Sequence, residues 1–319
     1  MTGRGFVRSW ADAWRRLRQR VGWLDHLVRA ALRYDQADGG RLAAAVTYYA
    51  FFATFSVGLL AFAVFGPVLD NPAVLGSVQR YTADNVPNVD VQTLRTARNT
   101  AGIVAFLGLP IAGWFWIDAV RSSIRKIWEV PEYPGRLVVR VLVDLLVLAG
   151  LGAVLAASLA VAYATTEIAN RVVDAAHPGA TPSRWLLSAV GLLLGIGVNA
   201  VLAAGMLTGL PRLRMPARRV VAPALLVGVG LELLKTLGRW YVHATEANPT
   251  YQLVAGSAGL LVFLNAINQL VLFAAALTAT STAGRPADLT GEGGKDVTPA
   301  GPDQHFHAAA GDDSRNDPA

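Results

Sequence analysis

Charged and amide side chains that interrupt long apolar runs are the residues of this sequence best placed to do chemistry. Glu232 and Lys235 lie three residues apart inside an apolar run, so a helix would place them on one face. A charge near the centre of a bilayer costs about 2.5–3.5 kcal/mol, and such residues usually face protein or a wet cavity. The pair therefore predicts either a substrate or proton site, or a self-neutralising ion pair in which Lys235 reaches the outer surface of the membrane.

Further polar residues collect at one depth when the apolar runs are measured from their ends at about 1.5 Å per helical residue. Five runs place such residues in the half of the membrane nearer the cytoplasm. We expect this set to line a cytoplasm-facing cavity: Tyr48, Asp118, Asp144, Asn199, Asn265 and Asn268. Asn265, Asn268 and Gln269 share one helical face, a pattern that also fits hydrogen bonds between neighbouring helices. Solute binding and ordinary helix packing both stay open for these residues.

Common catalytic and cofactor-binding patterns are missing from the sequence. No histidine stands at metal-ligand spacing from carboxylates, and the pair His305 and His307 lacks further ligands. There is no Walker A loop, no G-x-G-x-x-G loop and no G-x-S-x-G elbow. The sequence also has no cysteine for a thiolate site. We therefore expect no enzymatic activity, no metal and no cofactor. Arginines near the start make nucleic-acid binding only a weaker alternative, and no nucleic acid is expected as a partner.

Long uncharged runs are the elements that must position these residues. The run from Leu42 to Leu69 is longer than the roughly 20 apolar helical residues that cross a bilayer. The whole chain is 53% hydrophobic and only 16% charged, against roughly 25% charged in soluble domains. The sequence therefore predicts an all-α, polytopic membrane protein with six transmembrane helices, at about 43–66, 99–117, 145–166, 185–211, 220–238 and 251–279.

The segments on either side of this six-helix domain, 42–279, are expected to differ from it. Residues 1–41 repeat apolar residues at steps of three or four, including Trp10 and Trp14, with arginines largely on other faces. That pattern predicts an amphipathic basic helix, which either lies in the headgroup region or packs on the bundle. Residues 280–319 have almost no large apolar residue, so a disordered tail is expected.

The distribution of basic residues predicts the orientation of the chain. Lysine and arginine together number nine in residues 1–41, five in 121–140, four in 209–219 and three in 280–319. The alternating segments hold three (67–99), two (167–184) and two (Lys235 and Arg239). Since cytoplasmic loops carry the excess of basic residues, both termini are predicted to be cytoplasmic.

Three stretches resemble the YihY/BrkB family of membrane proteins, a group once labelled ribonuclease BN. They are AAAVTYYAFFATFS at 43–56, IRKIWEVPEYPGR at 124–136, and the last two apolar runs at 216–235 and 251–280. The resemblance covers about residues 35–280. It implies a plasma-membrane protein linked to envelope integrity, with transport suspected.

We therefore expect a transporter-like protein that moves a lipid or a small organic solute without ATP of its own. The alternative is a non-transporting scaffold of the envelope that binds lipid or partners. A membrane-tethered ribonuclease is the third class, and it is disfavoured because the clustered metal ligands of hydrolytic nucleases are missing. The bilayer is the partner that the composition requires, whereas no sequence feature indicates an oligomeric state.

Overall fold

Long helices make up nearly all of the structure. The computed structural model describes residues 21–65, 91–132, parts of 138–153, 181–245, 249–289 and 295–296. Its helices are α2 (Gly22–Gln36), α3 (Gly39–Phe65), α5 (Val91–Ile127), α7 (Thr181–Thr208), α8 (Ala217–Thr245) and α9 (Pro249–Thr280). The helical class predicted from the sequence is confirmed.

Three segments within the described residues are long and apolar enough to span a bilayer. They are Ala189–Thr208 in α7, Ala217–Gly238 in α8 and Gly256–Thr280 in α9. The expected span at 145–166 lies mostly outside the described residues, so six transmembrane helices remain a prediction.

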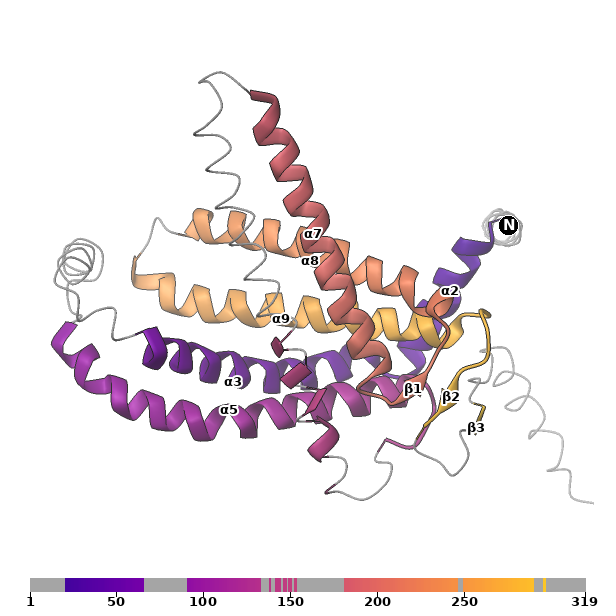
Figure 1. Ribbon diagram of the computed structural model, residues 1–319, viewed down its shortest axis with the longest axis horizontal. Coiled ribbons are helices and arrows are strands. Elements are labelled where there is room, and N and C mark those ends of the chain that lie inside the picture. Colours follow the sequence, from indigo (N-terminus) through magenta and orange to yellow (C-terminus); the bar gives the residue numbers. More distant parts are fainter. Residues whose placement is uncertain are drawn as a thin grey trace, which may run out of the picture.

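The helices pack around α9 (Figure 1). α3 contacts both α5 and α9, α9 also contacts α2 and α8, and α8 contacts α7, which crosses the other helices obliquely. Small residues dominate the contact surfaces, and the buried alanines include Ala43, Ala200, Ala203, Ala274 and Ala275. Because apolar lipid gives helices no hydrophobic reason to associate, close backbone approach at small residues supplies much of the packing energy.

A small antiparallel sheet lies beside one end of the bundle. Its strands are β1 (Leu213–Arg214), β2 (Ala287–Asp288) and β3 (Lys295–Asp296), in the order β1-β2-β3, and Leu213 pairs with Asp288. In Figure 1 the sheet lies at the end where α5 and α7 finish and α8 begins. The expected disorder from residue 280 is therefore wrong for residues 281–289, which follow α9 into this sheet. Residues 290–294 and 297–319 lie outside the described residues.

The described part of the N-terminal segment packs on the bundle. α2 contacts α9, where the imidazole Nε2 of His26 lies 2.9 Å from the carbonyl oxygen of Leu277. Ala30 and Arg33 on the same helix are buried. Packing on the bundle, one of the two expected alternatives, therefore describes Gly22–Gln36. The tryptophans Trp10 and Trp14 lie outside the described residues.

Two glycines explain how closely α7 and α8 approach. A Cβ atom on Gly228 would lie 2.6 Å from the carbonyl oxygen of Ile196 and 3.4 Å from the Cβ of Ala200. A Cβ on Gly195 would lie 2.6 Å from Oε1 of Glu232. By contrast, a Cβ on Gly197 would have no neighbour within 4 Å. The α7–α8 contact thus depends on the absence of a side chain at Gly228, where the neighbours are backbone atoms, whereas the neighbour of Gly195 is the end of a side chain.

We expect Gly228→Ala to destabilise the protein by about 1–3 kcal/mol, because the new methyl group must push α7 and α8 apart. Gly197→Ala is the matched control, since alanine there meets no neighbour and removes backbone freedom from the unfolded chain. Thermal unfolding of both purified proteins in detergent micelles measures the difference. Equal melting temperatures for the two variants would contradict the close packing of α7 on α8.

Candidate functional site

Four buried arginines stand at the end of the bundle that carries the sheet. Arg33, Arg121, Arg125 and Arg219 are each 3% exposed or less. A guanidinium group stays charged at any physiological pH and carries five N–H donors, so its burial is favourable only where acceptors surround it. The sequence analysis treated these arginines only as markers of orientation. The structure shows them as bridges between separate segments, and we refer to them as the arginine cluster.

Arg125 joins three segments of the chain. Its Nε donates to the carbonyl oxygen of Pro131 at 2.6 Å, and one terminal nitrogen donates to that of Pro211 at 2.5 Å. Both terminal nitrogens face the carboxylate of Asp288, at 2.7 and 3.3 Å. This two-pronged pairing fixes geometry as well as charge. Arg125 therefore holds the end of α5, the turn after α7 and strand β2 together.

Arg219 closes the C-terminal end of α9. It donates to the carbonyl oxygens of Thr278 at 2.6 Å and Ala279 at 3.2 Å, and to that of Ser281 at 2.5 Å. The last carbonyl groups of a helix have no partner inside the helix, and a cation there also interacts favourably with the helix dipole. The same guanidinium lies 5.1 Å from the ring centre of the fully buried Trp128. Arg219 thus links the start of α8 to the ends of α9 and α5.

Arg33 caps the C-terminal end of α5. Its Nε donates to the carbonyl oxygen of Ile127 at 2.6 Å, and it forms an ion pair with Glu129. Glu129 has φ 55°. The amides of Glu129 and Val130 donate to the carbonyls of Lys126 and Arg125, the pattern of a Schellman motif, in which glycine is usual at the left-handed position. The ion pair with Arg33 helps to hold a non-glycine residue in that conformation.

Two of the six expected cavity residues are charge partners of Arg121. Asp118 and Asp144 both form ion pairs with its guanidinium, and Arg121 and Asp144 are each 1% exposed. Both carboxylates are therefore neutralised within the protein. Asp118 precedes Arg121 by one helical turn, whereas Asp144 comes from the next segment of the chain.

The other expected cavity residues have different surroundings. Asn268 is buried and donates to the hydroxyl of Thr47 at 3.0 Å, which joins α9 to α3. Tyr48 is 60% exposed and its ring packs edge-on against Phe52. The side-chain oxygen of Asn265 is buried and has no hydrogen-bond partner in the part of the chain that the structure describes. These placements give Asn268 a packing role, the alternative left open for it above.

Asn199 contacts the pair that was expected to lie apart from it. Asn199 Nδ2 donates to Glu232 Oε1 at 2.9 Å, and Lys235 Nζ donates to the same oxygen at 2.6 Å. Asn199, Glu232 and Lys235, the polar triad from here on, thus join α7 to α8. Asn199 was assigned to the half of the membrane nearer the cytoplasm, whereas Glu232 was expected to pair with a lysine that reaches the outer surface. That assignment was wrong for at least one of them, because they are hydrogen bonded.

The cavity expected from these six residues stays a prediction. Their contacts within the described residues fall into separate groups, at Arg121, at Thr47, beside Phe52 and in the polar triad. Sequence reasoning also missed Arg33, Arg125, Arg219 and Asp288. The only available signal was the position of Arg125 and Trp128 inside a stretch that resembles the family.

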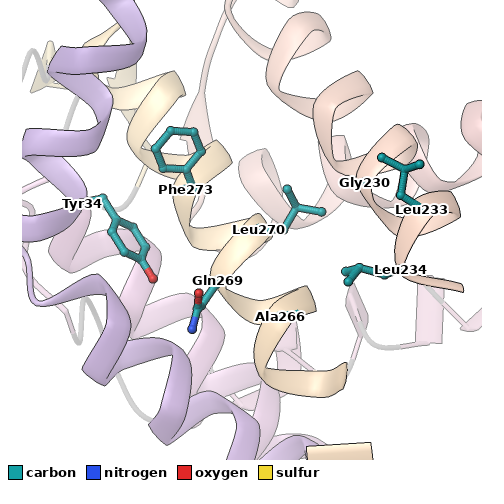
Figure 2. A pocket seen from close by; sticks show the side chains of 8 residues that line it. All are labelled: Tyr34, Gly230, Leu233, Leu234, Ala266, Gln269, Leu270 and Phe273. Carbon is teal, nitrogen blue, oxygen red and sulfur yellow. The ribbon is translucent and has the colours of Figure 1, made fainter. Parts of the chain in front are cut away.

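A cavity of about 460 Å³, widely open to the surface, lies between α2, α8 and α9 (Figure 2). Its lining is mainly apolar and consists of Tyr34, Gly230, Leu233, Leu234, Ala266, Gln269, Leu270 and Phe273. In Figure 2, Tyr34 of α2 lies beside Gln269, and the leucines of α8 lie on the other side of Leu270. Burial raises the pKa of the Tyr34 hydroxyl, which therefore stays protonated at neutral pH. That hydroxyl is buried and has no hydrogen-bond partner among the described residues.

Within the described residues, no group of three or more histidine, aspartate or glutamate side chains could hold a metal ion. The buried carboxylate of Asp144 and the partly buried one of Asp118 both form ion pairs with Arg121.

Apolar helices of membrane-spanning length, with buried arginines held by carboxylates and helix-end carbonyls at one end, define an integral membrane protein of the α-helical class. The chain belongs to the BrkB family, because the family model described as "Virulence factor BrkB" matches residues 30–297. The resemblance noted from the sequence is thereby confirmed.

Two relatives cover most of the chain. It is 26% identical over 280 residues to the inner membrane protein YhjD of Escherichia coli (strain K12), which spans 82% of each chain. It is also 26% identical over 294 residues to the uncharacterized protein Dda3937_02003 of Dickeya dadantii (strain 3937), with 87% of this chain and 88% of the relative covered. No solved structure matches the chain.

We expect Asp288→Asn to destabilise the protein by about 3–5 kcal/mol, because the fully buried guanidinium of Arg125 loses its counter-charge. Asp35→Asn is the control, since Asp35 is exposed on α2. Thermal unfolding of the purified full-length chains reports the difference. An Asp288→Asn protein as stable as the control would show that β2 does not depend on this ion pair.

Proposed function

We propose that this BrkB-family protein is a transporter-like protein of the plasma membrane that handles a lipid or another small organic solute and is linked to envelope integrity. The observation that carries this proposal is the apolar cavity between α2, α8 and α9. Under this proposal, the protein uses no ATP of its own, binds no cofactor and catalyses no reaction.

The lining of the cavity favours an amphiphile over a small charged solute. No lining residue is charged, and the polar groups there are the hydroxyl of Tyr34 and the amide of Gln269. An unpaired polar atom in an apolar wall is a donor or acceptor that a ligand can satisfy, whereas the leucines offer contact to a hydrocarbon chain. The cavity therefore suits an apolar chain that carries a neutral polar group.

The cavity also lies where membrane lipid could reach it. Its residues on α8 and α9 fall within the two apolar segments Ala217–Gly238 and Gly256–Thr280. Phe273 stands seven residues before the end of α9 and Ala266 fourteen, about 10 and 21 Å along the helix. The lining thus runs from near the arginine cluster to about the middle of the span, a depth at which acyl chains lie.

A non-transporting envelope scaffold is the second candidate, and the arginine cluster favours it. Guanidinium groups that bridge Ile127, Pro211 and Thr278 would resist the rearrangement that alternating access requires at that end of the bundle. The two candidates differ in whether bound lipid crosses the membrane. Proteoliposomes that contain the purified chain and a fluorescent phospholipid separate them by the rate of exchange between leaflets.

For the orientation, we propose that the end with the arginine cluster faces the cytoplasm. α2, the turn at 209–216 and the segment after α9 all meet at that end. They belong to the segments richest in lysine and arginine, which the positive-inside rule assigns to the cytoplasm. Both termini would then be cytoplasmic.

Single cysteines test the orientation on a clean background, because the chain has no cysteine of its own. We expect an impermeant thiol reagent added to intact cells to label Ser183→Cys, at the start of α7, and to leave Ser9→Cys unlabelled. Permeabilised cells are the control, in which both sites should react. Labelling of Ser9→Cys in intact cells would reverse the proposed topology.

A cavity-filling substitution tests the lipid site. We expect Leu270→Trp to reduce cross-linking of a phospholipid with a photoactivatable acyl chain by about tenfold, the equivalent of about 1.4 kcal/mol, because the indole occupies the cavity. Val262→Trp is the matched control, since Val262 is 70% exposed on the same helix. The measurement is the yield of lipid-modified α8 and α9 peptides. Equal yields from the two variants would place the lipid elsewhere.

A further inference from the structure

Three exposed arginines lie together where α8 begins, beside the segment that follows α9. They are Arg214 on β1, Arg218 in the first turn of α8 and Arg285 just before β2, and we call them the basic patch. We propose that the basic patch binds the phosphate group of an anionic phospholipid whose acyl chain lies along α8. This inference stands independently of the proposed function, because none of the three arginines lines the cavity.

The pairing of β1 with β2 brings Arg214 close to Arg285. Arg214 lies opposite Ala287, and Arg285 precedes Ala287 by two residues. Burial alternates from Arg285 to Asp288, as it does where successive side chains point to opposite faces of an extended segment. The paired residues Leu213 and Asp288 are buried, whereas Arg214 and Arg285 are exposed. Both arginines therefore lie on the exposed side of the sheet.

The turn at Gly284 brings Arg218 to the same place. Gly284 has φ 69°, and a Cβ atom on it would lie 2.6 Å from Cγ of Pro216. Gly284 directly precedes Arg285, and Pro216 stands two residues before Arg218. In Figure 1, β1 and β2 lie at the end of the bundle where α8 begins. The three arginines thus come from one short stretch, 214–218, and from the segment that packs directly against it.

The basic patch has no acceptor of its own in the protein. Within the described residues, none of its three guanidinium groups takes part in an ion pair or a hydrogen bond. The carboxylate nearest to Arg285 in the sequence, Asp288, is buried and paired with Arg125. A guanidinium group carries five N–H donors and no acceptor, and neighbouring cations repel one another unless an anion lies between them. The patch is therefore suited to an anion from outside the chain.

The depth of the patch matches that of lipid phosphates. The apolar segment of α8 begins at Ala217 and that of α9 ends at Thr280. Arg218 lies at the first of these boundaries, Arg214 stands three residues before it, and Arg285 stands five residues after the second. A bilayer is about 30 Å thick in its hydrocarbon core and about 40–45 Å with its headgroups, so a headgroup layer about 5–8 Å deep begins at such a boundary. Arginine side chains extend readily into that layer.

An exposed apolar face of α8 continues from Arg218 along the membrane span. Val221, Leu225 and Val229 are 53%, 45% and 43% exposed, and none of them lines the cavity. They follow Arg218 at three, seven and eleven residues, so the four side chains share one face of the helix. A lipid whose phosphate lies at Arg218 can therefore place an acyl chain along these side chains. A free phosphate ion or a nucleic acid has no group that matches this face, and this difference favours a lipid.

The charge of the patch favours an anionic headgroup over a zwitterionic one. Two N–H groups of one guanidinium match two oxygens of a phosphate, and both kinds of phospholipid offer such oxygens. The choline group of phosphatidylcholine, however, also brings a cation close to the three arginines, and like charges repel. Phosphatidylglycerol carries a net negative charge and no cation. We therefore expect the patch to prefer phosphatidylglycerol.

Native mass spectrometry of the purified full-length chain in detergent micelles, with phosphatidylglycerol added, tests the proposal. A basic residue near a membrane surface contributes attraction to anionic lipid worth about fivefold in affinity. We therefore expect Arg218→Gln to weaken binding by about fivefold, and the triple variant Arg214→Gln, Arg218→Gln, Arg285→Gln to weaken it by more than tenfold. Arg41→Gln is the matched control, because Arg41 is also exposed but is paired with Asp38, and its affinity should stay at the wild-type value.

Two further arms separate the patch from other sites. Each variant is also measured together with Leu270→Trp, so that lipid in the cavity does not contribute to the difference. Phosphatidylcholine should bind more weakly than phosphatidylglycerol and should bind equally to the wild type and the triple variant. Thermal unfolding of each variant reports whether it is folded. If the triple variant does not fold, the comparison of Arg218→Gln with Arg41→Gln decides.

Two results would overturn the proposal. Equal affinity of the patch variants and Arg41→Gln for phosphatidylglycerol would show that the exposed arginines do not hold the headgroup. Displacement of phosphatidylglycerol by an excess of inorganic phosphate, or of a single-stranded RNA oligonucleotide, would assign the patch to a free anion or to a nucleic acid instead of a lipid.

Discussion

The burial of guanidinium groups is the constraint on which the ordered end of this protein depends. Each of the four arginines must find several acceptors, because a buried charge without partners is costly. Helix C-termini supply such acceptors, since their last carbonyls have no partner within the helix. Arg33 and Arg219 use carbonyls at the ends of α5 and α9, and Arg125 adds the carboxylate of Asp288. The same hydrogen bonds therefore provide acceptors for the buried guanidinium groups and cap the ends of α5 and α9.

The helices were predictable because their cause is local. An apolar run of bilayer length must satisfy its backbone groups internally, so it forms a helix whatever it packs against. The expected span at 251–279 accordingly lies within α9, Pro249–Thr280. The arginine contacts were not predictable in this way, since the partners of Arg125 at Pro211 and Asp288 are 86 and 163 residues distant. The composition of the tail likewise gave no sign that Asp288 pairs with Arg125.

Depth along a span is only one of the coordinates that bring side chains together. Rotation about the helix axis decides the neighbour, and it directs Tyr48 outward while Asn268 turns toward Thr47. Tilt matters as well: α7 crosses its neighbours obliquely in Figure 1, so equal counts from the ends do not give equal depths. Asn199 therefore meets Glu232, from which counting had separated it.

α8 contributes residues to the arginine cluster, to the cavity and to the polar triad. Arg219 near its start is held by the end of α9, which fixes that end of the helix. Farther along, Gly230, Leu233 and Leu234 line the cavity on one face, whereas Glu232 and Lys235 meet α7 on the other. A displacement of the far half of α8 would change the cavity and the triad together and leave the arginine cluster intact. Because both faces belong to one helix, a movement of α8 that breaks the contact between Glu232 and α7 would also move the α8 residues that line the cavity.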